Sequence, residues 1–518
     1  MQTIGAPSTS KSILPYLSPR RLLARVGWQY RLSSLHPLNQ RSFASSNDVK
    51  KNGEADGRER ASPGSSDPST QSTTSSSPPS SSTSQSAVPP DWDENPDLNI
   101  SAFSQLPHST FGYNQHMIIN SEFKEALRQI LWQFRAPIRY AFAYGSGVFP
   151  QTASSSKSAS TVHAHPSPAI SSMQGGQGKM IDFIFGVSYT QHWHSLNLQQ
   201  HRDHYSAIGS LGSSFVSRVQ DNYGAGLYFN PYVTVNGTLI KYGVVNLDTL
   251  CRDLSEWDTL YLAGRLQKPV KILRDDPRVR LANQINLISA VRTALLLLPS
   301  DFTEQELYGT IAGLSYLGDP RMALPAENPN KVANIIKYQL PNFRRLYAPL
   351  IENLPNVAFH DPRCKSSDWM DDPDTNATLA QDMDPKKRGN MVRRLPRSFR
   401  SKLYFRYQTK FQIPQLDFDQ MLEESDDQDP TRVKKQQGSV FDQRVANDRP
   451  EDLRGEVKKA IQSTVQWPSV TQSLKSIVTT GVVRSIRYVR EKMEKYREGR
   501  KREKGDRSHS SSGASKST

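Results

Sequence analysis

Hydrophobic positions between residues 123 and 245 follow a helical period first and a strand period afterwards. Apolar side chains recur every three or four residues before Pro137, which predicts a helix that this proline ends: Phe123, Leu127, Ile130, Leu131 and Phe134. Residues 138–144 alternate and residues 180–187 are nearly all apolar, so both predict strands. Asn236-Gly237 joins two β-rich runs and predicts a hairpin. We expect an α+β fold with a mixed sheet over residues 101–270.

Residues 271–410 have a mostly helical pattern. One apolar stripe predicts a helix over 281–298: Leu281, Ile285, Ile288, Val291 and Leu295. Thr303 and Glu306 have the spacing of a capping box at the start of the next helix. Residues 364–384 are acid-rich and predict a loop. The sequence therefore predicts a second, helical domain after the mixed-sheet domain.

Residues 461–504 combine an apolar stripe with basic side chains. The apolar positions recur every three or four residues: Trp467, Val470, Leu474, Ile477, Val478, Val482, Ile486, Val489, Met493 and Tyr496. A helix of this kind can pack on the protein's own core, form a coiled coil, or bury its apolar face in a membrane surface. Because basic residues dominate its charge, we favour docking on an anionic membrane.

Several segments are low in complexity or biased in charge. Residues 1–47 carry six basic residues and no acid, which is typical of a mitochondrial transit peptide; a disordered basic arm is the alternative. Residues 48–100 are rich in Ser and Pro and predict disorder. Residues 152–178 predict a Ser/Gly-rich surface insert, 411–460 an acidic linker, and 505–518 a disordered tail.

Composition limits the classes of protein that remain. A length of 518 residues suggests two or three domains, and a net charge of +15 favours a polyanionic partner such as a nucleotide or an anionic lipid. No apolar run is long enough to span a membrane. Cys251 and Cys364 cannot supply a four-thiolate zinc site or a disulfide framework.

A glycine turn and a lone carboxylate are the main candidates for chemistry. Gly145-Ser146-Gly147 directly follows a predicted strand, and Asp182 lies in another. Backbone N–H groups of such a turn can approach phosphate closely, Ser146 can donate its hydroxyl, and Asp182 can hold Mg²⁺ against a triphosphate. A plain turn and an aspartate satisfied by backbone donors remain the alternative.

Histidines and lysines are weaker candidates. His192, His194, His201 and His204 cluster, but their spacing does not present four zinc ligands on one helix face, which favours packing and hydrogen-bonding roles. Lys241 on the hairpin, and Lys268 and Lys271 after it, can neutralise phosphate or serve as ordinary surface charge.

Together these motifs resemble the mitochondrial translocator assembly and maintenance family, the mitochondrial phosphatidate cytidylyltransferases. The resemblance extends over about residues 110–345, apart from the serine-rich insert. It rests on these runs: Tyr144-Gly145-Ser146-Gly147-Val148-Phe149, Met180-Ile181-Asp182-Phe183, Trp193-His194-Ser195-Leu196-Asn197, His204-Tyr205-Ser206, Asn222-Tyr223-Gly224-Ala225-Gly226, Leu239-Ile240-Lys241-Tyr242-Gly243 and Tyr261-Leu262-Ala263-Gly264-Arg265-Leu266-Gln267-Lys268-Pro269-Val270.

The resemblance implies synthesis of CDP-diacylglycerol and pyrophosphate from CTP and phosphatidic acid with Mg²⁺, at the matrix face of the mitochondrial inner membrane, for cardiolipin synthesis. It implies a nucleotidyltransferase domain of the polymerase-beta type followed by a winged-helix-like domain. Its implied site residues are Gly145, Ser146 and Gly147 at the triphosphate, Asp182 at the metal, Lys241 and Lys268 at phosphate, and His194, Asn197, His204 and Tyr205 in the cleft.

One position departs from the pattern of the wider superfamily, which has a second acid two residues after the first. Ile184 stands there, so a second metal ligand has to come from elsewhere, with Asp248 and Asp253 as candidates. The departure supports an alternative function, a non-enzymatic mitochondrial assembly factor with a degenerate nucleotidyltransferase fold. An RNA nucleotidyltransferase is a third possibility, but the sequence lacks a basic-aromatic platform for bases, and we expect no nucleic acid partner.

Overall fold

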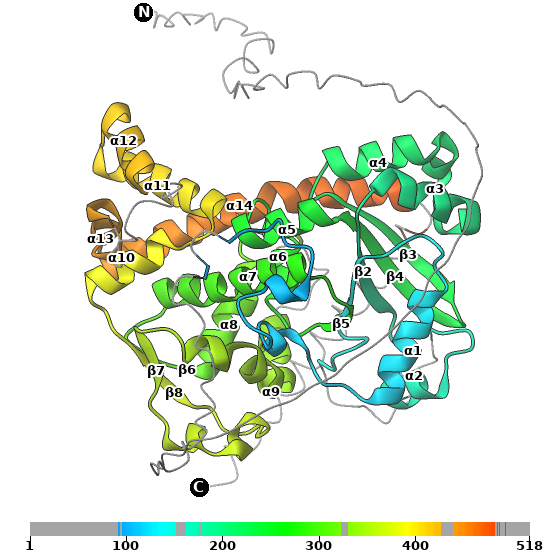
Figure 1. Cartoon of the computed structure of the whole chain (residues 1–518), viewed down its shortest axis with the longest axis horizontal. Coiled ribbons are helices and arrows are strands. Elements are labelled where there is room, and N and C mark those ends of the chain that lie inside the picture. The colour runs from blue at the N-terminus through cyan, green and yellow to red at the C-terminus, as the bar shows by residue number, and fades with distance from the viewer. Residues whose placement is uncertain are drawn as a thin grey trace, which may run out of the picture. The chain divides into compact units, whose positions relative to one another are not determined.

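The computed structural model describes residues 92–93, 96–151, 162–175, 178–322, 330–425 and 439–481, with 484, 486, 490 and 493 (Figure 1). The chain divides into two units, residues 1–81 and 82–518, and every described residue belongs to the second. The predicted transit peptide and the predicted tail after residue 504 therefore lie outside the described residues. Among the described residues, no helix is long and apolar enough to cross a membrane.

A five-stranded mixed sheet forms the first half of the described chain. Its order is β3-β4-β2-β1-β5, with β1 Tyr140–Tyr144, β2 Ile181–Val187, β3 Leu227–Val235, β4 Thr238–Asn246 and β5 Lys271–Arg274. Only β2 and β4 pair in parallel, and the other neighbours are antiparallel. The predicted α+β class with a mixed sheet is confirmed, as is the hairpin at Asn236-Gly237, which joins β3 to β4.

The two faces of this sheet carry different side chains because successive residues of a strand point to opposite faces. On one face Phe185 packs against Phe134, at 5.1 Å between ring centroids, and against Tyr242, at 5.3 Å. Three helices contact strands of this sheet: α1 Ser121–Trp132 contacts β5, α3 Thr190–Gln200 contacts β4, and α4 Ser213–Asn222 contacts β3 and β4. On the opposite face lie Asp182 and, farther along β2, Ile184 and Gly186, next to α5 Leu247–Glu256.

The second half is mainly helical. Its central helix α7, Pro277–Leu297, is buried along almost its whole length and is joined by α6 Ala263–Leu266, α8 Glu304–Leu314, α9 Lys331–Ile351, α10 Pro385–Arg393 and α11 Arg397–Phe411. A small antiparallel sheet runs in the order β6-β8-β7, with β6 Asp301–Thr303, β7 Val357–Phe359 and β8 Thr378–Gln381. The capping box of Thr303 and Glu306 is confirmed at the start of α8.

The acid-rich segment 364–384 is tied down by a buried ion pair. The guanidinium of Arg344 in α9 pairs with the carboxylate of Glu304 in α8, at 2.6 Å, and both side chains are fully buried. The same guanidinium donates to the carbonyls of Trp369, Asp372 and Thr375. The segment consists of short helical turns and strand β8. Through these carbonyls, Arg344 fixes the segment to α8 and α9.

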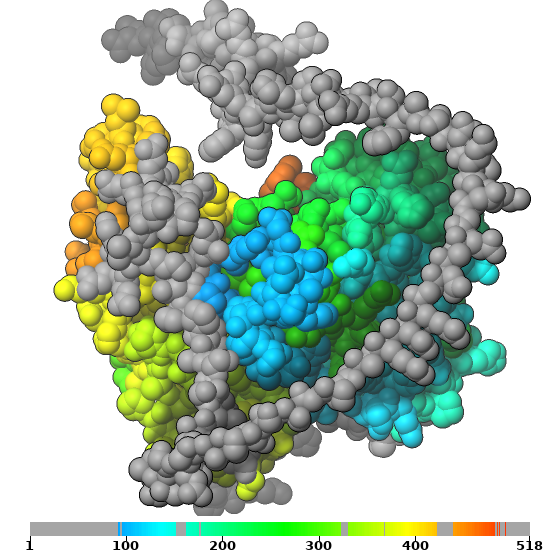
Figure 2. All heavy atoms as spheres, viewed as in Figure 1, coloured from blue at the N-terminus to red at the C-terminus, as the bar shows by residue number. Residues whose placement is uncertain are grey.

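The end of the segment predicted to be disordered, 48–100, is part of the fold. The carboxylate of Asp93 is buried and pairs with Arg292 of α7 and, at 3.6 Å, with Arg394. Trp92 packs edge-on against Phe111, with ring centroids 5.0 Å apart. Figure 2 shows the start of the described chain, in blue, beside green parts of the molecule, and Trp92, Leu98 and Phe111 pack in one cluster with Leu281 and Ile285 of α7. The low-complexity composition ends just before Trp92, and the prediction of disorder was wrong for the described residues 92–93 and 96–100.

The predicted surface insert 152–178 also differs from a simple loop. Residues 152–161 and 176–177 lie outside the described part, but 168–173 form helix α2, Pro168–Met173. Ile170 of this helix is 1% exposed and belongs to the main core, and His163 is 4% exposed. A few apolar residues in a polar composition are enough to fix a segment when they meet the core.

The predicted acidic linker 411–460 contains helices α12 Gln415–Ser425 and α13 Val440–Ala446 and the start of α14, Pro450–Thr480. Residues 426–438 lie outside the described part. Phe441 and Val445 are buried, and the Tyr404 hydroxyl donates to the buried carboxylate of Asp442. From residue 439 onward the expectation of a solvated linker was therefore wrong.

Helix α14 starts eleven residues before the predicted boundary at 461 and contacts α11, α7 and β3, so it runs along both halves of the fold (Figure 1). Its first half packs on the core through buried apolar side chains: Leu453, Val457, Ala460, Ile461 and Val465. In its second half the pattern is inverted. The buried side chains are polar (Ser469, Gln472, Lys475, Thr479 and Thr480), and the exposed ones include Trp467, Leu474, Ile477 and Val478.

Candidate active site

A glycine turn leads out of β1 at the edge of the site. Gly145 has φ of +80°, and a Cβ atom there would lie 3.3 Å from the Asp182 carboxylate. At Gly147 a Cβ would lie 2.7 Å from the Met180 carbonyl, so any side chain would collide with the backbone. The Gly145 carbonyl accepts the N–H groups of Val148 and Phe149, which closes the turn. Both glycines are required by the close approach of the turn to β2.

Asp182 lies between Tyr144 and Lys241 in the register of the sheet. It is the Cα partner of Tyr144 across the β1–β2 pair and of Lys241 across the β2–β4 pair. The Lys241 ammonium lies 3.4 Å from the Asp182 carboxylate and 4.7 Å from the centre of the Phe229 ring. Both charged side chains are partly exposed. Three strands thus bring the predicted turn, aspartate and lysine together.

Cationic side chains from outside the sheet gather near Tyr144 and a second tyrosine, Tyr261. The Arg265 guanidinium lies 4.0 Å from the Tyr261 ring centre and 5.8 Å from that of Tyr144, and Arg321 lies 5.9 Å from Tyr261. Burial would raise the pKa of Tyr261, but the nearby cations Arg265, Arg321 and Lys241 lower it overall. Burial, followed by the charge of Asp182, raises the pKa of Tyr144.

Lys268 is the most perturbed cation of this group. Its ammonium donates to the Ser315 hydroxyl at 3.0 Å and lies 4.9 Å from the Tyr316 ring, which Lys331 approaches at 5.0 Å. Burial, helped by repulsion from Arg265 and Lys331, lowers the pKa of Lys268 to about 7. Arg321 of this group also pairs with the buried Asp319, at 2.6 Å. A group of cations that outnumbers the carboxylates beside it can bind a polyanion such as a triphosphate.

Asp253, a predicted metal ligand, has another role. Its buried carboxylate accepts five hydrogen bonds of 2.8–3.1 Å, from the N–H groups of Thr259, Leu260, Leu262 and Ala263 and from the Thr259 hydroxyl. These bonds fix the start of α6, which carries Arg265. Asp248, the other predicted ligand, is exposed and pairs with Arg278 at 2.7 Å. The structure therefore brings neither carboxylate to Asp182, and Ile184 is fully buried beside Gly243.

The predicted cleft residues His194, Asn197, His204 and Tyr205 lie on the other face of the sheet. The Asn197 amide donates to the hydroxyls of Tyr205 and Tyr242, at 2.9 and 3.0 Å. Tyr242 follows Lys241 in β4, and successive strand residues point to opposite faces. His194 nitrogens lie 2.8 Å from Tyr205 and from Gln220, and burial lowers the pKa of His194 to about 4. The expectation that these residues line the cleft with Asp182 was wrong, because sequence order alone does not indicate the sheet face.

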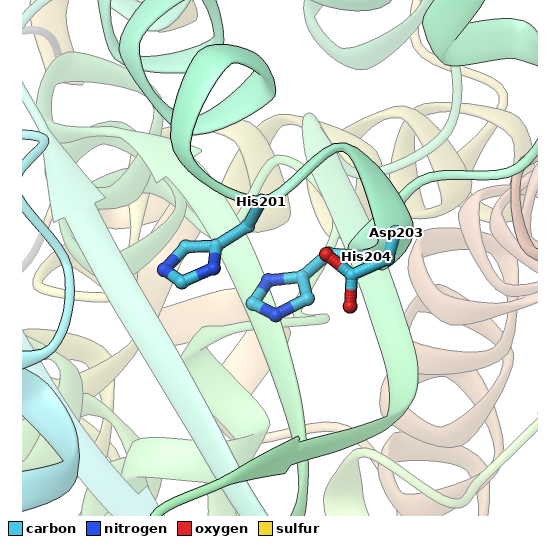
Figure 3. A group of neighbouring side chains, drawn as sticks. All are labelled: His201, Asp203 and His204. Carbon is cyan, nitrogen blue, oxygen red and sulfur yellow. The ribbon is translucent and has the colours of Figure 1, made fainter.

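The nearest approach to a metal cluster in the described residues is His201, Asp203 and His204 (Figure 3). The two imidazole rings are stacked, with centroids 4.3 Å apart and planes within 6°. A metal ion binds in the ring plane along a nitrogen lone pair. Because the lone pairs of stacked rings lie in two parallel planes, they do not converge on one ion in this arrangement.

Arg265, Arg321 and Lys331 were not predicted as site residues. Arg265 lies inside one of the motifs that carry the resemblance, so its sequence context was a usable signal. Arg321 and Lys331 come more than 130 residues after Asp182 and carry no local pattern. Lys271 does not join the group, since its ammonium donates to the Met117 carbonyl.

Comparisons with known proteins identify relatives of this chain. Residues 127–495 match the family model described as mitochondrial phosphatidate cytidylyltransferase. The chain is 36% identical over 388 residues to the phosphatidate cytidylyltransferase of Schizosaccharomyces pombe, covering 74% of this chain and 86% of that protein. It is 36% identical over 370 residues to that of Xenopus laevis, covering 71% and 93%, and 42% identical over 266 residues to that of Saccharomyces cerevisiae, covering 50% and 64%.

The matches define the class of this protein as a nucleotidyltransferase enzyme. More particularly, the chain belongs to the mitochondrial phosphatidate cytidylyltransferase family.

Proposed function

We propose that this enzyme makes CDP-diacylglycerol and pyrophosphate from CTP and phosphatidic acid. The observation that carries the proposal is the adjacency of Asp182, Lys241 and the glycine turn at Gly145, in a chain whose relatives are named for this reaction. The mixed sheet with its glycine turn supports a nucleotidyltransferase domain of the polymerase-beta type. Helices α7–α9 with the small β6-β8-β7 sheet support a winged-helix-like second domain.

The chemistry needs no nucleophile from the protein. A phosphate oxygen of phosphatidic acid forms a bond to the α-phosphorus of CTP, and the bond from that phosphorus to the leaving pyrophosphate oxygen breaks. Negative charge builds up on the pyrophosphate, and Lys241, Arg265 and Lys268 are the cations that would stabilise it. Arg321 would have to share its charge with Asp319. The N–H groups of the glycine turn and the Ser146 hydroxyl would orient the triphosphate.

Asp182 fits a Mg²⁺ site. It offers a partly exposed carboxylate beside the glycine turn, and Mg²⁺ sites commonly use one or two carboxylates together with substrate phosphates. When bound, Mg²⁺ would neutralise triphosphate charge. Lys241 would then exchange its contact with Asp182 for one with phosphate.

The second half of α14 supports docking on an anionic membrane. Trp467, Leu474 and Val478 lie at i, i+7 and i+11, on one face of the helix, and are 59–71% exposed. There is no Asp or Glu between Glu456 and Glu491. An exposed apolar stripe that is followed in the sequence by a run of basic residues from Arg484 on suits an interfacial helix, and the lipid substrate stays in the bilayer. We place the enzyme peripherally at the matrix side of the mitochondrial inner membrane, after import by the N-terminal transit peptide, where its product would feed cardiolipin synthesis.

A pyrophosphate-release assay tests the proposal. Protein lacking residues 1–90 keeps Trp92 and Asp93, and it is mixed with Mg²⁺, one of the four nucleoside triphosphates, and liposomes with or without phosphatidic acid. We expect release only with CTP and phosphatidic acid together. Release with other lipids, or extension of an RNA primer, would contradict the proposal.

The alternative of a non-enzymatic assembly factor rests on Ile184 alone and runs against the membership of this chain in an enzyme family. The fully buried Ile184 removes the position at which a second acid would stand. That function predicts no pyrophosphate release from folded, liposome-bound protein, and it predicts that Asp182→Ala keeps the cellular function. Loss of the cellular function in Asp182→Ala would exclude it.

A further inference from the structure

The side chain of Gln174, in the insert between β1 and β2, contacts the glycine turn. This residue directly follows α2, and its amide nitrogen donates to the carbonyls of Gly147 and Lys179, both at 3.0 Å. Its amide oxygen accepts the Lys179 N–H at 2.5 Å and lies 3.1 Å from His163 Nε2. All four hydrogen-bonding positions of the amide are therefore used. One of its partners is the backbone of the proposed phosphate-binding turn.

His163 extends this connection to β4. Its Nδ1 accepts the backbone N–H of Leu239 at 2.9 Å, which puts the ring proton on Nε2. That Nε2–H then donates to the Gln174 oxygen. Leu239 is two residues before Lys241, so one chain of hydrogen bonds runs from the Lys241 strand through His163 and Gln174 to Gly147.

The insert that carries His163 and Gln174 is itself anchored to the fold at two points. Ile170 anchors α2 in the main core, and the His165 N–H donates to the Gly237 carbonyl in the hairpin at 3.0 Å. His163 is 4% exposed, so its hydrogen bonds are shielded from water. A segment that the sequence shows as a serine-rich interruption of the resemblance therefore forms a bridge between two parts of the site.

We propose that Gln174 is a positioning residue, which with His163 fixes the glycine turn and the Lys241 strand in the geometry that binds the triphosphate. This inference rests on the proposed function. It implies that the insert contributes to affinity for the nucleotide although no side chain of it belongs to the reacting groups. A turn held in its bound geometry loses less entropy when the ligand arrives.

Gln174→Glu is the sharpest variant, because it keeps the size of the side chain and replaces the donating nitrogen with an oxygen that faces two carbonyls. We expect the KM for CTP to rise about 10-fold while kcat changes less than about 2-fold, since loss of this partly buried hydrogen bond loosens the turn. Hydrogen–deuterium exchange of residues 145–149 should accelerate. His163→Leu should accelerate exchange both there and at Leu239. Ser172→Ala, an exposed neighbour on α2, is the matched control.

The outcomes separate cleanly. An unchanged KM and unchanged exchange at 145–149 in both Gln174→Glu and His163→Leu would overturn the inference. Faster exchange throughout the protein with equal loss of kcat and kcat/KM would also overturn it, because Gln174 would then serve stability alone. If the wild-type enzyme released no pyrophosphate, the proposed function would fail, whereas the exchange at 145–149 would still decide whether Gln174 fixes the turn.

Discussion

Asp182 and Lys241 are direct partners on the only parallel pair of strands in the main sheet, with carboxylate and ammonium 3.4 Å apart. The parallel pairing puts both residues at the same level of the sheet, next to the glycine turn. An anion that arrives at the turn therefore meets a lysine already held in place, and a carboxylate available for a cation.

Asp182→Asn should reduce pyrophosphate release by on the order of 100- to 1,000-fold, because it removes the charge that would hold Mg²⁺ while keeping the shape of the side chain. Asp248→Asn, measured alongside, should change the rate less than about 3-fold, since Asp248 is exposed on another element and pairs with Arg278. A large loss in Asp248→Asn would restore that residue as a metal ligand.

Binding of CTP should take up a proton at Lys268. Because the pKa of this lysine is lowered to about 7, it is mostly neutral at pH 8 without ligand, and the triphosphate favours the charged form. The KM for CTP should therefore rise as the pH increases above about 7. Calorimetric titration at pH 8 in two buffers of different ionisation enthalpy measures the proton directly.

Lys268→Arg provides the comparison, because a guanidinium stays charged over this range. We expect it to abolish most of the proton uptake. Uptake that is equal in Lys268→Arg and wild type would show that another group titrates.

Stability should fall as the pH decreases from about 6.5 towards 4, in part because of His194. Burial lowers its pKa to about 4 in the folded state, so between these values the unfolded chain binds a proton that the folded chain does not. The effect is on the order of 3 kcal/mol when fully developed. Urea unfolding at pH 7.5 and pH 5 should show a smaller difference in His194→Gln than in wild type. The exposed His192→Gln is the control and should behave as wild type.

Removal of residues 1–90 should leave the fold intact, whereas removal of 1–100 should destabilise it. The longer deletion takes away Asp93 and leaves Arg292, 3% exposed, buried without its carboxylate. Breaking a buried pair from one side typically costs about 3–5 kcal/mol. Asp93→Asn should lower the thermal midpoint by several degrees, and the exposed Asp97→Asn should not. Equal midpoints for the two variants would show that the pair contributes little.

Exchange of Trp467, Leu474 and Val478 for glutamine should weaken sedimentation with anionic liposomes by about 10-fold or more, because their apolar area is the part of α14 that faces outward. These variants spare Gln472 and Lys475, whose buried amide and ammonium hold α14 to Leu227 and Tyr223. Phe405→Gln, which removes an exposed aromatic ring from α11, is the control. Unchanged sedimentation of the triple variant would remove the membrane role of this stripe.

Local patterns were sufficient for the elements that build the centre of the site. The alternation around β1, the apolar run of β2 and the Asn236-Gly237 hairpin predicted the strands that carry the glycine turn, Asp182 and Lys241, because strand period and turn chemistry depend on neighbouring residues. The capping box at Thr303 is equally local. The predictions failed where composition was taken as a guide to burial, at Asp93, Ile170 and Phe441.

The sequence by itself determined the family, the mixed sheet and the residues at the glycine turn, since each depends on short-range spacing. Only the tertiary structure decided that His194 and Asn197 lie behind the sheet and that Asp253 fixes α6. It also decided that Arg321 and Arg265 both lie near the Tyr261 ring, and that the Gln174 amide donates to the Gly147 carbonyl. The physical reason is that sheet faces, buried ion pairs and hydrogen bonds between distant segments depend on which parts of the chain meet in space, and a linear pattern carries no measure of those encounters.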